Sequence, residues 1–305
     1  MLIVFGFFLT ILASLQKPYL HTRPDKLFVN FLTTIYKGVA MNVSANNHLA
    51  SFAQIVKNST QRFAALPAHV QWDIYSTLKP NHYICQHESQ LMAYNALFAN
   101  QHFAKLIDLF DFVFGRFIEI EQITALQNTT QPISVIDYGC GQGLASMVLQ
   151  EFNRERQLGY QFEEVILIEP SALALKEAVK NNSLYYTNIK QYCRKFDQIT
   201  ADDLHTKHQV TIHLLSNVLD LPNIDVTALA SCIKPSLSGV NIFVCCSPNF
   251  SNAVNGIKRF CDVFDNDVEN MYYHKDYCDV ESFEMRSQRL CKYRVPRYAK
   301  MFVMQ

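Results

Sequence analysis

Short apolar runs alternate with helical stretches from residue 132 onward. The runs cover residues 133–137, 165–169, 210–215 and 240–246, with a weaker one at 189–193. Runs of this length are typical of strands buried on both faces of a parallel sheet. The alternation of strand and helix predicts an α/β doubly wound domain. Near the C-terminus, apolar and polar residues alternate over 282–289 and 298–304, and we expect these segments to pair as two terminal strands.

The region from about residue 45 to 120 has a different pattern, because its apolar residues recur at helical spacing. The clearest stripe contains Leu91, Tyr94, Leu97 and Phe98. The pattern predicts three or four helices before the sheet. We therefore divide the chain into an apolar leader at 1–40, a helical cap at 41–128 and the sheet domain at 129–305.

The first fifteen residues are almost entirely apolar. They are shorter than the roughly 20 residues that a membrane-spanning helix needs. A basic segment before them and a clear cleavage site after them are both lacking. Met41 is a second possible translation start, and a polar segment follows it. We interpret residues 1–40 as an over-extended start, with a membrane anchor through 1–15 and a signal peptide as alternatives.

Composition narrows the function classes. Apolar residues make up 49% of the 305 residues and charged residues 18%, which excludes a disordered or fibrous protein. Nine cysteines without a CxxC pair indicate a reducing compartment, so we expect a cytoplasmic protein. His82, Cys85 and His87 imitate half of a zinc site, but no second half follows. We expect no metal.

Charge is balanced over the whole chain, with 27 basic and 27 acidic residues. A general electrostatic attraction to nucleic acid is therefore not expected. Six basic residues do gather in the segment 286–300, where they could form a local nucleic-acid strip. Eight acidic residues precede them between 262 and 284. Pairing between these acids and bases is the interpretation that we favour over a nucleic-acid partner.

A glycine cluster follows the first predicted strand. Gly139, Gly141 and Gly143 fall within five residues, in a chain with only nine glycines. Glycines let the backbone turn sharply and let a ligand lie against it, and the helix that follows offers free N–H groups. A dinucleotide site prefers GxGxxG, whereas the spacing here is GxGxG. Asp137, just before the loop, suits a cationic ligand such as S-adenosylmethionine (SAM).

The second predicted strand ends in Glu169, followed by Pro170 and Ser171. An acidic side chain at this position can accept both hydroxyls of a ribose. Adenosine occurs in both NAD and SAM, so Glu169 favours a nucleoside ligand without choosing between them. The structural alternative for the loop and Glu169 is a tight turn with a helix-capping acid.

These segments resemble motifs of the class I SAM-dependent methyltransferase superfamily. DYGCGQG resembles its first motif, IEPS its second and HLLSNVLDL its fourth. The resemblance implies a mostly parallel seven-stranded sheet with its last strand antiparallel, and SAM as the cofactor. It places the first-motif loop under the methionine part of SAM, Glu169 on the ribose and an acid after the third strand near the adenine. The cofactor-binding residues implied are Asp137, Gly139, Gly141, Gln142, Gly143, Glu169, Ser171 and Asp197.

The same resemblance points the end of the fourth strand at the transferred methyl group. Asn217 and Asp220 are therefore the catalytic candidates, and the alternative is that they cap the next helix. Tyr94, His102 and Lys105 are among the polar residues of the helices expected to cover the pocket, and His102 could serve as a base.

The sequence therefore predicts SAM-dependent methyl transfer to an acceptor that it does not identify. A SAM-binding module without catalytic activity is the alternative. An NAD-dependent oxidoreductase is disfavoured by the glycine spacing.

Overall fold

The structure of the protein is a computed structural model, and it describes residues 51–78, 84–121, 123–126, 130–268 and 270–305. The leader at 1–40, with its three interpretations, lies outside these residues. None of the helices within the described ranges combines the length and apolarity that crossing a bilayer requires.

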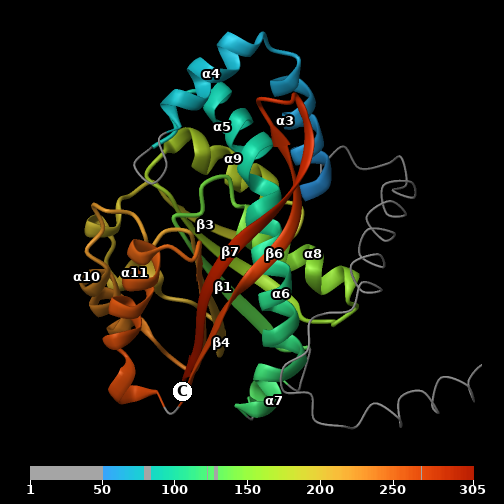
Figure 1. The fold of residues 1–305 in the computed structure, drawn as a ribbon. Coiled ribbons are helices and arrows are strands. Elements are labelled where there is room, and N and C mark those ends of the chain that lie inside the picture. The colour runs from blue at the N-terminus through green and yellow to red at the C-terminus, as the bar shows by residue number, and fades with distance from the viewer. Residues whose placement is uncertain (1–50, 79–83, 122, 127–129, 269) are drawn as a thin grey trace, which may run out of the picture. The chain divides into compact units, whose positions relative to one another are not determined.

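Seven strands form one sheet, in the order β3-β2-β1-β4-β5-β7-β6 (Figure 1). The first five strands are parallel, whereas β7 is antiparallel to both β5 and β6. This topology confirms the predicted doubly wound, mostly parallel seven-stranded sheet. The strands are β1 (Pro132–Tyr138), β2 (Gln161–Ile168), β3 (Asn188–Tyr192), β4 (Val210–Ser216), β5 (Val240–Ser247), β6 (Met271–Glu284) and β7 (Arg289–Met304).

Helices cover both faces of the sheet. The long helix α6 (Asn100–Phe112), α8 (Leu144–Glu155) and α9 (Ala172–Asn182) contribute to one hydrophobic core. On the opposite face, α10 (Val226–Ile233) and α11 (Ser251–Asp262) pack against a second core (Figure 1). The adjacent Cys245 and Cys246 of β5 belong to different cores, as expected for neighbouring residues of a strand buried on both faces.

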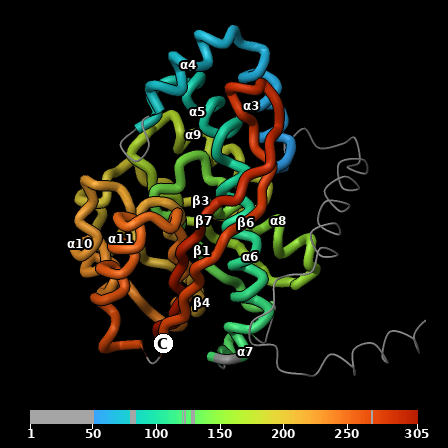
Figure 2. Tube along the Cα trace, viewed as in Figure 1, coloured from blue at the N-terminus to red at the C-terminus, as the bar shows by residue number. Residues whose placement is uncertain are grey.

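The cap region contains the predicted helices. They are α3 (Phe52–Ala64), α4 (Ala68–Thr77) and a helical run that starts with α5 (Glu88–Tyr94), passes through α6 and ends with α7 (Ile118–Ile120). Two π-helical segments, η1 (Asn95–Ala99) and η2 (Val113–Phe117), flank α6 within that run. The tube in Figure 2 follows this run along the hairpin of β6 and β7.

The C-terminal strands pair as expected, but the predicted bounds of 282–289 and 298–304 are wrong. Residues 285–288 form the turn, while β6 and β7 extend far beyond the predicted segments. The apolar pattern did not predict the full length of these strands because charged residues occupy much of it. The register places Asp279 opposite Arg294 and Glu281 opposite Lys292. Opposite charges on facing strands stabilise a ribbon that apolar periodicity alone does not reveal. The turn end reaches the cap, where Phe283 packs in a third core.

The direction of chain crossing reverses between β1 and β4, because β2 and β3 lie on one side of β1 and β4 and β5 on the other. Doubly wound sheets bind ligands outside the carboxyl ends of the strands at such a point. The loops after β1, β2 and β4 therefore define the candidate site.

Candidate functional site

The loop between β1 and α8 contains the three clustered glycines, all in left-handed conformation with φ of 61°, 54° and 71°. A Cβ at Gly139 would lie 2.6 Å from Val218 Cγ1, and one at Gly143 would lie 2.2 Å from Asn182 Nδ2. A Cβ at Gly141 would meet nothing within 4 Å. The outer two glycines are thus required by packing within the protein, while Gly141 borders open space that a ligand can fill.

Asp137 lies beneath the start of α8 and is buried. Its Oδ2 accepts a hydrogen bond from the backbone N–H of Ser146 at 3.1 Å. Burial raises the pKa of the Asp137 carboxyl to about 7, although the Ser146 bonds act in the opposite direction. The side chain therefore stabilises the first turn of α8 and is also poised to ionise when a cation approaches.

Glu169 connects the ends of β1 and β2. Its Oε2 accepts a hydrogen bond from the N–H of Gly141 at 3.0 Å, and its Oε1 accepts one from the N–H of Ser171 at 2.9 Å. Burial raises the pKa of Glu169, and the two backbone donors lower it. A carboxylate oxygen can accept more than one hydrogen bond, so Glu169 retains acceptor capacity for a ligand hydroxyl beside the open space at Gly141.

Ser171 lies at the N-cap of α9, where its Oγ accepts a hydrogen bond from the N–H of Ala174. The same hydroxyl donates to the backbone carbonyl of Cys85, which precedes α5. The predicted contact of Ser171 with the cofactor stays a prediction, and the hydroxyl joins the sheet domain to the cap.

Gln142 is also turned toward the cap. Its Nε2 donates to the carbonyl of Leu91 at 3.1 Å and to Asn95 Oδ1 at 2.9 Å, while Asn95 Nδ2 donates back to Gln142 Oε1. This reciprocal amide pair is buried. The amide of Gln142 therefore binds the cap helices, and a role toward a cofactor would fall to its backbone.

Asp197 lies in η4 (Phe196–Gln198), a 3-10 helix that follows β3, and its side chain is exposed. The neighbouring Phe196 approaches the glycine loop, with its Cζ 3.3 Å from the position that a Gly139 Cβ would take. The segment after β3 thus reaches the loop through an aromatic ring that the sequence did not single out. The adenine contact of Asp197 stays a prediction.

Asn217 follows β4 with a φ of 58°, a left-handed conformation that asparagine tolerates better than most residues. Its N–H donates to the carbonyl of Cys246 at 2.7 Å. Its Oδ1 accepts a hydrogen bond from Lys105 Nζ, and its Nδ2 faces His102 Nδ1 and donates to Ser216 Oγ. The amide is therefore engaged on both sides, and Asn217 positions the two α6 side chains.

His102 continues this chain of hydrogen bonds to Tyr94. The Tyr94 hydroxyl lies 3.0 Å from His102 Nε2, and the two rings stack with centroids 5.6 Å apart. Two turns of a regular α-helix take about seven residues, whereas these residues are eight apart. The wider π-helical segment η1 between them supplies the additional residue and brings them into line.

Lys105 is buried, with only 2% of its surface exposed. Burial lowers the pKa of its ammonium group, and the nearby charge of Asp220 acts in the opposite direction. Asp220 is half-buried, accepts a long hydrogen bond from Ser247 Oγ at 3.5 Å and lines a cavity of about 200 Å³ with Phe250 and Asn252. Neither catalytic candidate caps the following helix, because Asp225 performs that role for α10.

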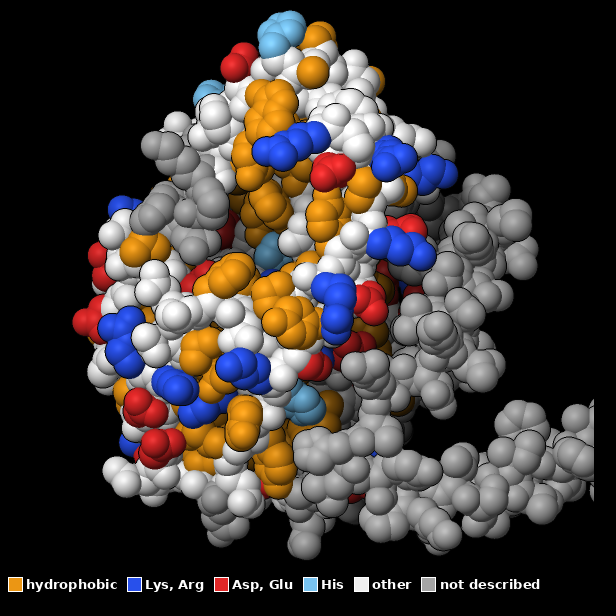
Figure 3. Space-filling view, in the orientation of Figure 1, with side chains coloured by type: hydrophobic (Ala, Val, Ile, Leu, Met, Phe, Trp, Pro, Cys, Tyr) orange, Lys and Arg blue, Asp and Glu red, His pale blue; other side chains and the backbone are white. Residues whose placement is uncertain are grey.

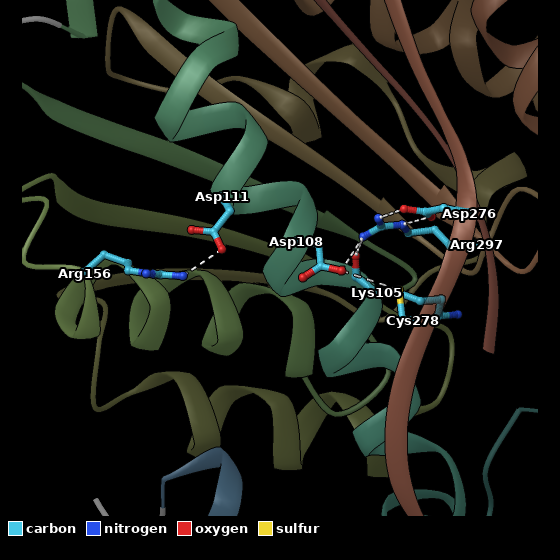
Figure 4. A network of polar contacts seen from close by, with 7 residues as sticks. All are labelled: Lys105, Asp108, Asp111, Arg156, Asp276, Cys278 and Arg297. Atoms are coloured by element: carbon cyan, nitrogen blue, oxygen red, sulfur yellow. Dashed lines mark hydrogen bonds and ion pairs between the residues drawn. The ribbon is translucent and has the colours of Figure 1, made fainter. Parts of the chain in front are cut away.

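The C-terminal basic residues are partly committed to ion pairs. Arg297 is buried, with its Nε 2.8 Å from Asp276 Oδ1 and its Nη1 donating to the carbonyl of Lys105 at 3.0 Å (Figure 4). Arg294 pairs with Asp279 at 3.6 Å. Figure 3 shows acidic and basic side chains interspersed on the visible face. Arg294 and Arg297, two of the six basic residues in 286–300, are therefore paired with acids of β6.

The cysteines and the potential metal ligands are further candidates for parts of a site. All nine cysteines lie in the described part of the chain, and all are free thiols. His82 lies outside the described residues, and among those described no three His, Cys, Asp or Glu side chains are grouped to hold a metal ion.

Solved structures that resemble this chain include TehB and two methyltransferases. TehB from Haemophilus influenzae is 15% identical, with 61% of this chain and 62% of that chain covered and a TM-score of 0.39. A SAM-dependent methyltransferase from Leishmania major is 11% identical, covers 83% of this chain and 84% of its own length, and has a TM-score of 0.35. A tRNA methyltransferase from Aquifex aeolicus is 14% identical over 62% and 69%, with a TM-score of 0.36.

No family model matches the sequence, and no curated protein matches it. At these identities and scores, the fold is established by this chain's own sheet, with five parallel strands, an antiparallel β7 and a glycine loop at the reversal between β1 and β4.

Proposed function

We propose that this protein is a SAM-dependent methyltransferase whose acceptor is still to be identified. One observation carries the proposal most directly. The open space above Gly141 is bordered by Glu169, whose carboxylate is bonded to the Gly141 N–H at 3.0 Å. A glycine without a Cβ beside an acid at the adjoining strand end suits a ribose lying against the backbone.

The charges around this space favour a cation over a pyrophosphate. Asp137, Glu169 and Asp220 come from the ends of three neighbouring strands. SAM carries an ammonium and a sulfonium group, and its sulfonium supplies an activated methyl group. Three acids around the pyrophosphate of a dinucleotide would repel it instead.

In this proposal each residue has a limited task. Glu169 accepts hydrogen bonds from the ribose hydroxyls, and Asp137 balances the positive charge of the ligand. The cap covers the site through Tyr94 and the Gln142–Asn95 pair and so excludes water. Asn217 positions His102 and Lys105. Such alignment can contribute roughly 7–11 kcal/mol to a displacement reaction.

Binding measurements test the cofactor first. Calorimetry with the full chain should give a Kd for SAM well below that for NAD, and mass spectrometry of the purified protein should reveal SAM or its demethylated product. Tighter binding of NAD would overturn the proposal.

Turnover then separates an enzyme from a binding module. Methyl-labelled SAM, incubated with the protein and fractions of an extract of the encoding organism, should transfer label to a discrete fraction. Tight SAM binding without transfer to any fraction would favour the non-catalytic module. We further propose a reducing cytosol as the compartment, in keeping with nine free thiols.

A further inference from the structure

Lys105 is an uncommon feature of the candidate site, because it is a lysine amine enclosed without a carboxylate. Only 2% of the residue is exposed. Its Nζ donates to the neutral amide of Asn217. Among the residues that the structure describes, no carboxylate lies within ion-pair distance of it. An unpaired buried ammonium is costly, so this environment favours the neutral amine, which has a free lone pair.

The other members of the hydrogen-bonded chain, Tyr94, His102 and Asn217, have no such capacity. Both ring nitrogens of His102 are engaged, one with Tyr94 and one with Asn217. Burial raises the pKa of the Tyr94 hydroxyl, which keeps its proton. Asn217 is a neutral amide. Within this hydrogen-bonded chain, Lys105 is therefore the basic group with an unshared electron pair to offer.

We propose that Lys105 accepts the proton that the methyl acceptor loses, and that the acceptor therefore reacts through an O–H or N–H group. This inference rests on the proposed methyl transfer. The nucleophilic atom bonds to the methyl carbon, the carbon–sulfur bond of SAM breaks, and the sulfur keeps that electron pair. The proton of the acceptor moves to Lys105 Nζ, which becomes an ammonium. A carboxylate acceptor would have no proton to lose and would leave this amine without a task.

The surroundings of Lys105 define how it titrates. Asp220 after β4, Cys246 on β5 and Cys278 on β6 raise its pKa, whereas Arg297 on β7 lowers it. His102 is the titratable neighbour on α6 itself. Asp220 also stabilises the ammonium that forms on proton transfer. Removing the Asp220 charge should therefore lower the pKa of Lys105 further.

The backbone of Lys105 is fixed from the opposite side. Arg297 Nη1 donates to its carbonyl at 3.0 Å, while the same guanidinium binds Asp276 (Figure 4). Arg297 is itself buried. This anchor ties the backbone of α6 to the terminal hairpin of β6 and β7, while the amine of Lys105 is bonded to Asn217 after β4.

The first test measures the amine directly and needs no acceptor. Nitrogen NMR of the full chain with labelled lysine is followed over pH, and the Lys105 signal is identified by its loss in Lys105→Arg. We expect its midpoint to lie below that of exposed Lys176 on α9 and to fall further in Asp220→Asn. A Lys105 midpoint at or above that of Lys176 would overturn the inference.

The second test measures methyl transfer from labelled SAM to the active extract fraction. Lys105→Ala should lose about 10²–10⁴-fold in rate while SAM binding is retained. Added methylamine should restore part of the rate, because a small amine can occupy the vacated space and take the proton. In Lys105→Arg, whose side chain stays charged and fills the space, added methylamine should not restore the rate. Lys176→Met is the matched control and should behave like the wild type.

The outcomes of these tests distinguish a failure of the proposed Lys105 role from a failure of the proposed methyl transfer. Wild-type protein that fails to bind SAM would overturn the proposed function, and this inference with it. Wild-type protein that binds and transfers, with Lys105→Ala within about threefold of its rate and with the same pH profile, would overturn the role of Lys105 alone. If Lys105→Ala is unfolded by circular dichroism, Lys105→Met replaces it, and its rate decides by the same criterion.

Discussion

The carboxylate of Glu169 accepts a hydrogen bond from the backbone N–H of Gly141 at 3.0 Å, across 28 residues of sequence. This bond joins the glycine loop after β1 to the end of β2. It fixes the one loop glycine whose Cβ position is open. A ligand above Gly141 would therefore contact both the bare backbone and the carboxylate.

Replacing Glu169 by alanine should weaken SAM binding about 10- to 150-fold, because a charge-assisted hydrogen bond is worth roughly 1.5–3 kcal/mol. Calorimetry on the folded variant measures the change in Kd. Glu163→Ala, at an exposed position near the start of β2, is the control and should bind normally. An unchanged Kd in Glu169→Ala would mean that the acid only orders the turn.

Gly141 and Gly139 should respond differently to substitution. Gly141→Val should abolish SAM binding and leave the sheet formed, because its side chain enters ligand space and resists a φ of 54°. Gly139→Ala should mainly lower the free energy of unfolding, since its Cβ would lie 2.6 Å from Val218 Cγ1. Circular dichroism and thermal melting separate the two effects. Normal SAM binding by the valine variant would remove the loop from the cofactor site.

SAM affinity should increase with pH through the titration of Asp137. Burial raises the pKa of this carboxyl from 3.8 to about 7, so the folded protein holds the proton more tightly than the unfolded chain. The protonated Asp137 carboxyl thus contributes fully to the free energy of unfolding below about pH 4, and this contribution is lost as the pH rises to about 7. A bound cation favours the ionised form, and the Kd should fall by up to about 10-fold per pH unit below that pKa.

Asp137→Asn tests this linkage, because its amide oxygen can still accept the Ser146 N–H. The variant should bind SAM with little pH dependence between pH 5 and pH 8, a range chosen to bracket a pKa of about 7. It should also gain stability relative to the wild type as the pH rises. Calorimetry in two buffers of different ionisation enthalpy should detect proton release in the wild type only. Equal proton release by both proteins would contradict the assignment.

The reciprocal amide pair of Gln142 and Asn95 should couple the loop to the cap. Either single alanine substitution leaves a buried amide without its partner and should cost about 1–3 kcal/mol of stability. The double variant should cost less than the sum, with a coupling energy of about 0.5–3 kcal/mol in a double-mutant cycle. Strict additivity would show that the two amides do not stabilise each other.

A chain that starts at Met41 should fold and bind SAM. Helix α3 is anchored to the sheet domain without residues 1–40, because the N–H of Phe52 at its start donates to buried Glu151 of α8 at 2.7 Å. Melting temperature and SAM affinity should match those of the full chain. Aggregation, or a large fall in melting temperature, would contradict our interpretation of residues 1–40. N-terminal sequencing of the native protein tests the start itself.

The buried strands were predictable because burial on both faces leaves a local mark. A run such as that around Val135 must be apolar to occupy the centre of the sheet, and the positive φ of Gly139, Gly141 and Gly143 is the conformation that glycine adopts without a steric cost. Such requirements act on adjacent residues, so the sequence alone indicates a strand, a turn and an acid in order.

The hairpin bounds and the partners of polar side chains were decided only by tertiary structure. Whether an amide such as Gln142 faces a cofactor or the cap depends on which distant residue meets it, here Asn95. Tyr94 and His102 come into line only because a π-helical segment widens the turn between them. The sequence placed Lys105 among the polar residues of the helices that cover the pocket, and only the fold shows that its amine is buried and bonded to Asn217 after β4. Hydrophobic periodicity records how much of a segment is buried, whereas the identity of each polar contact depends on residues that only the folded chain brings together.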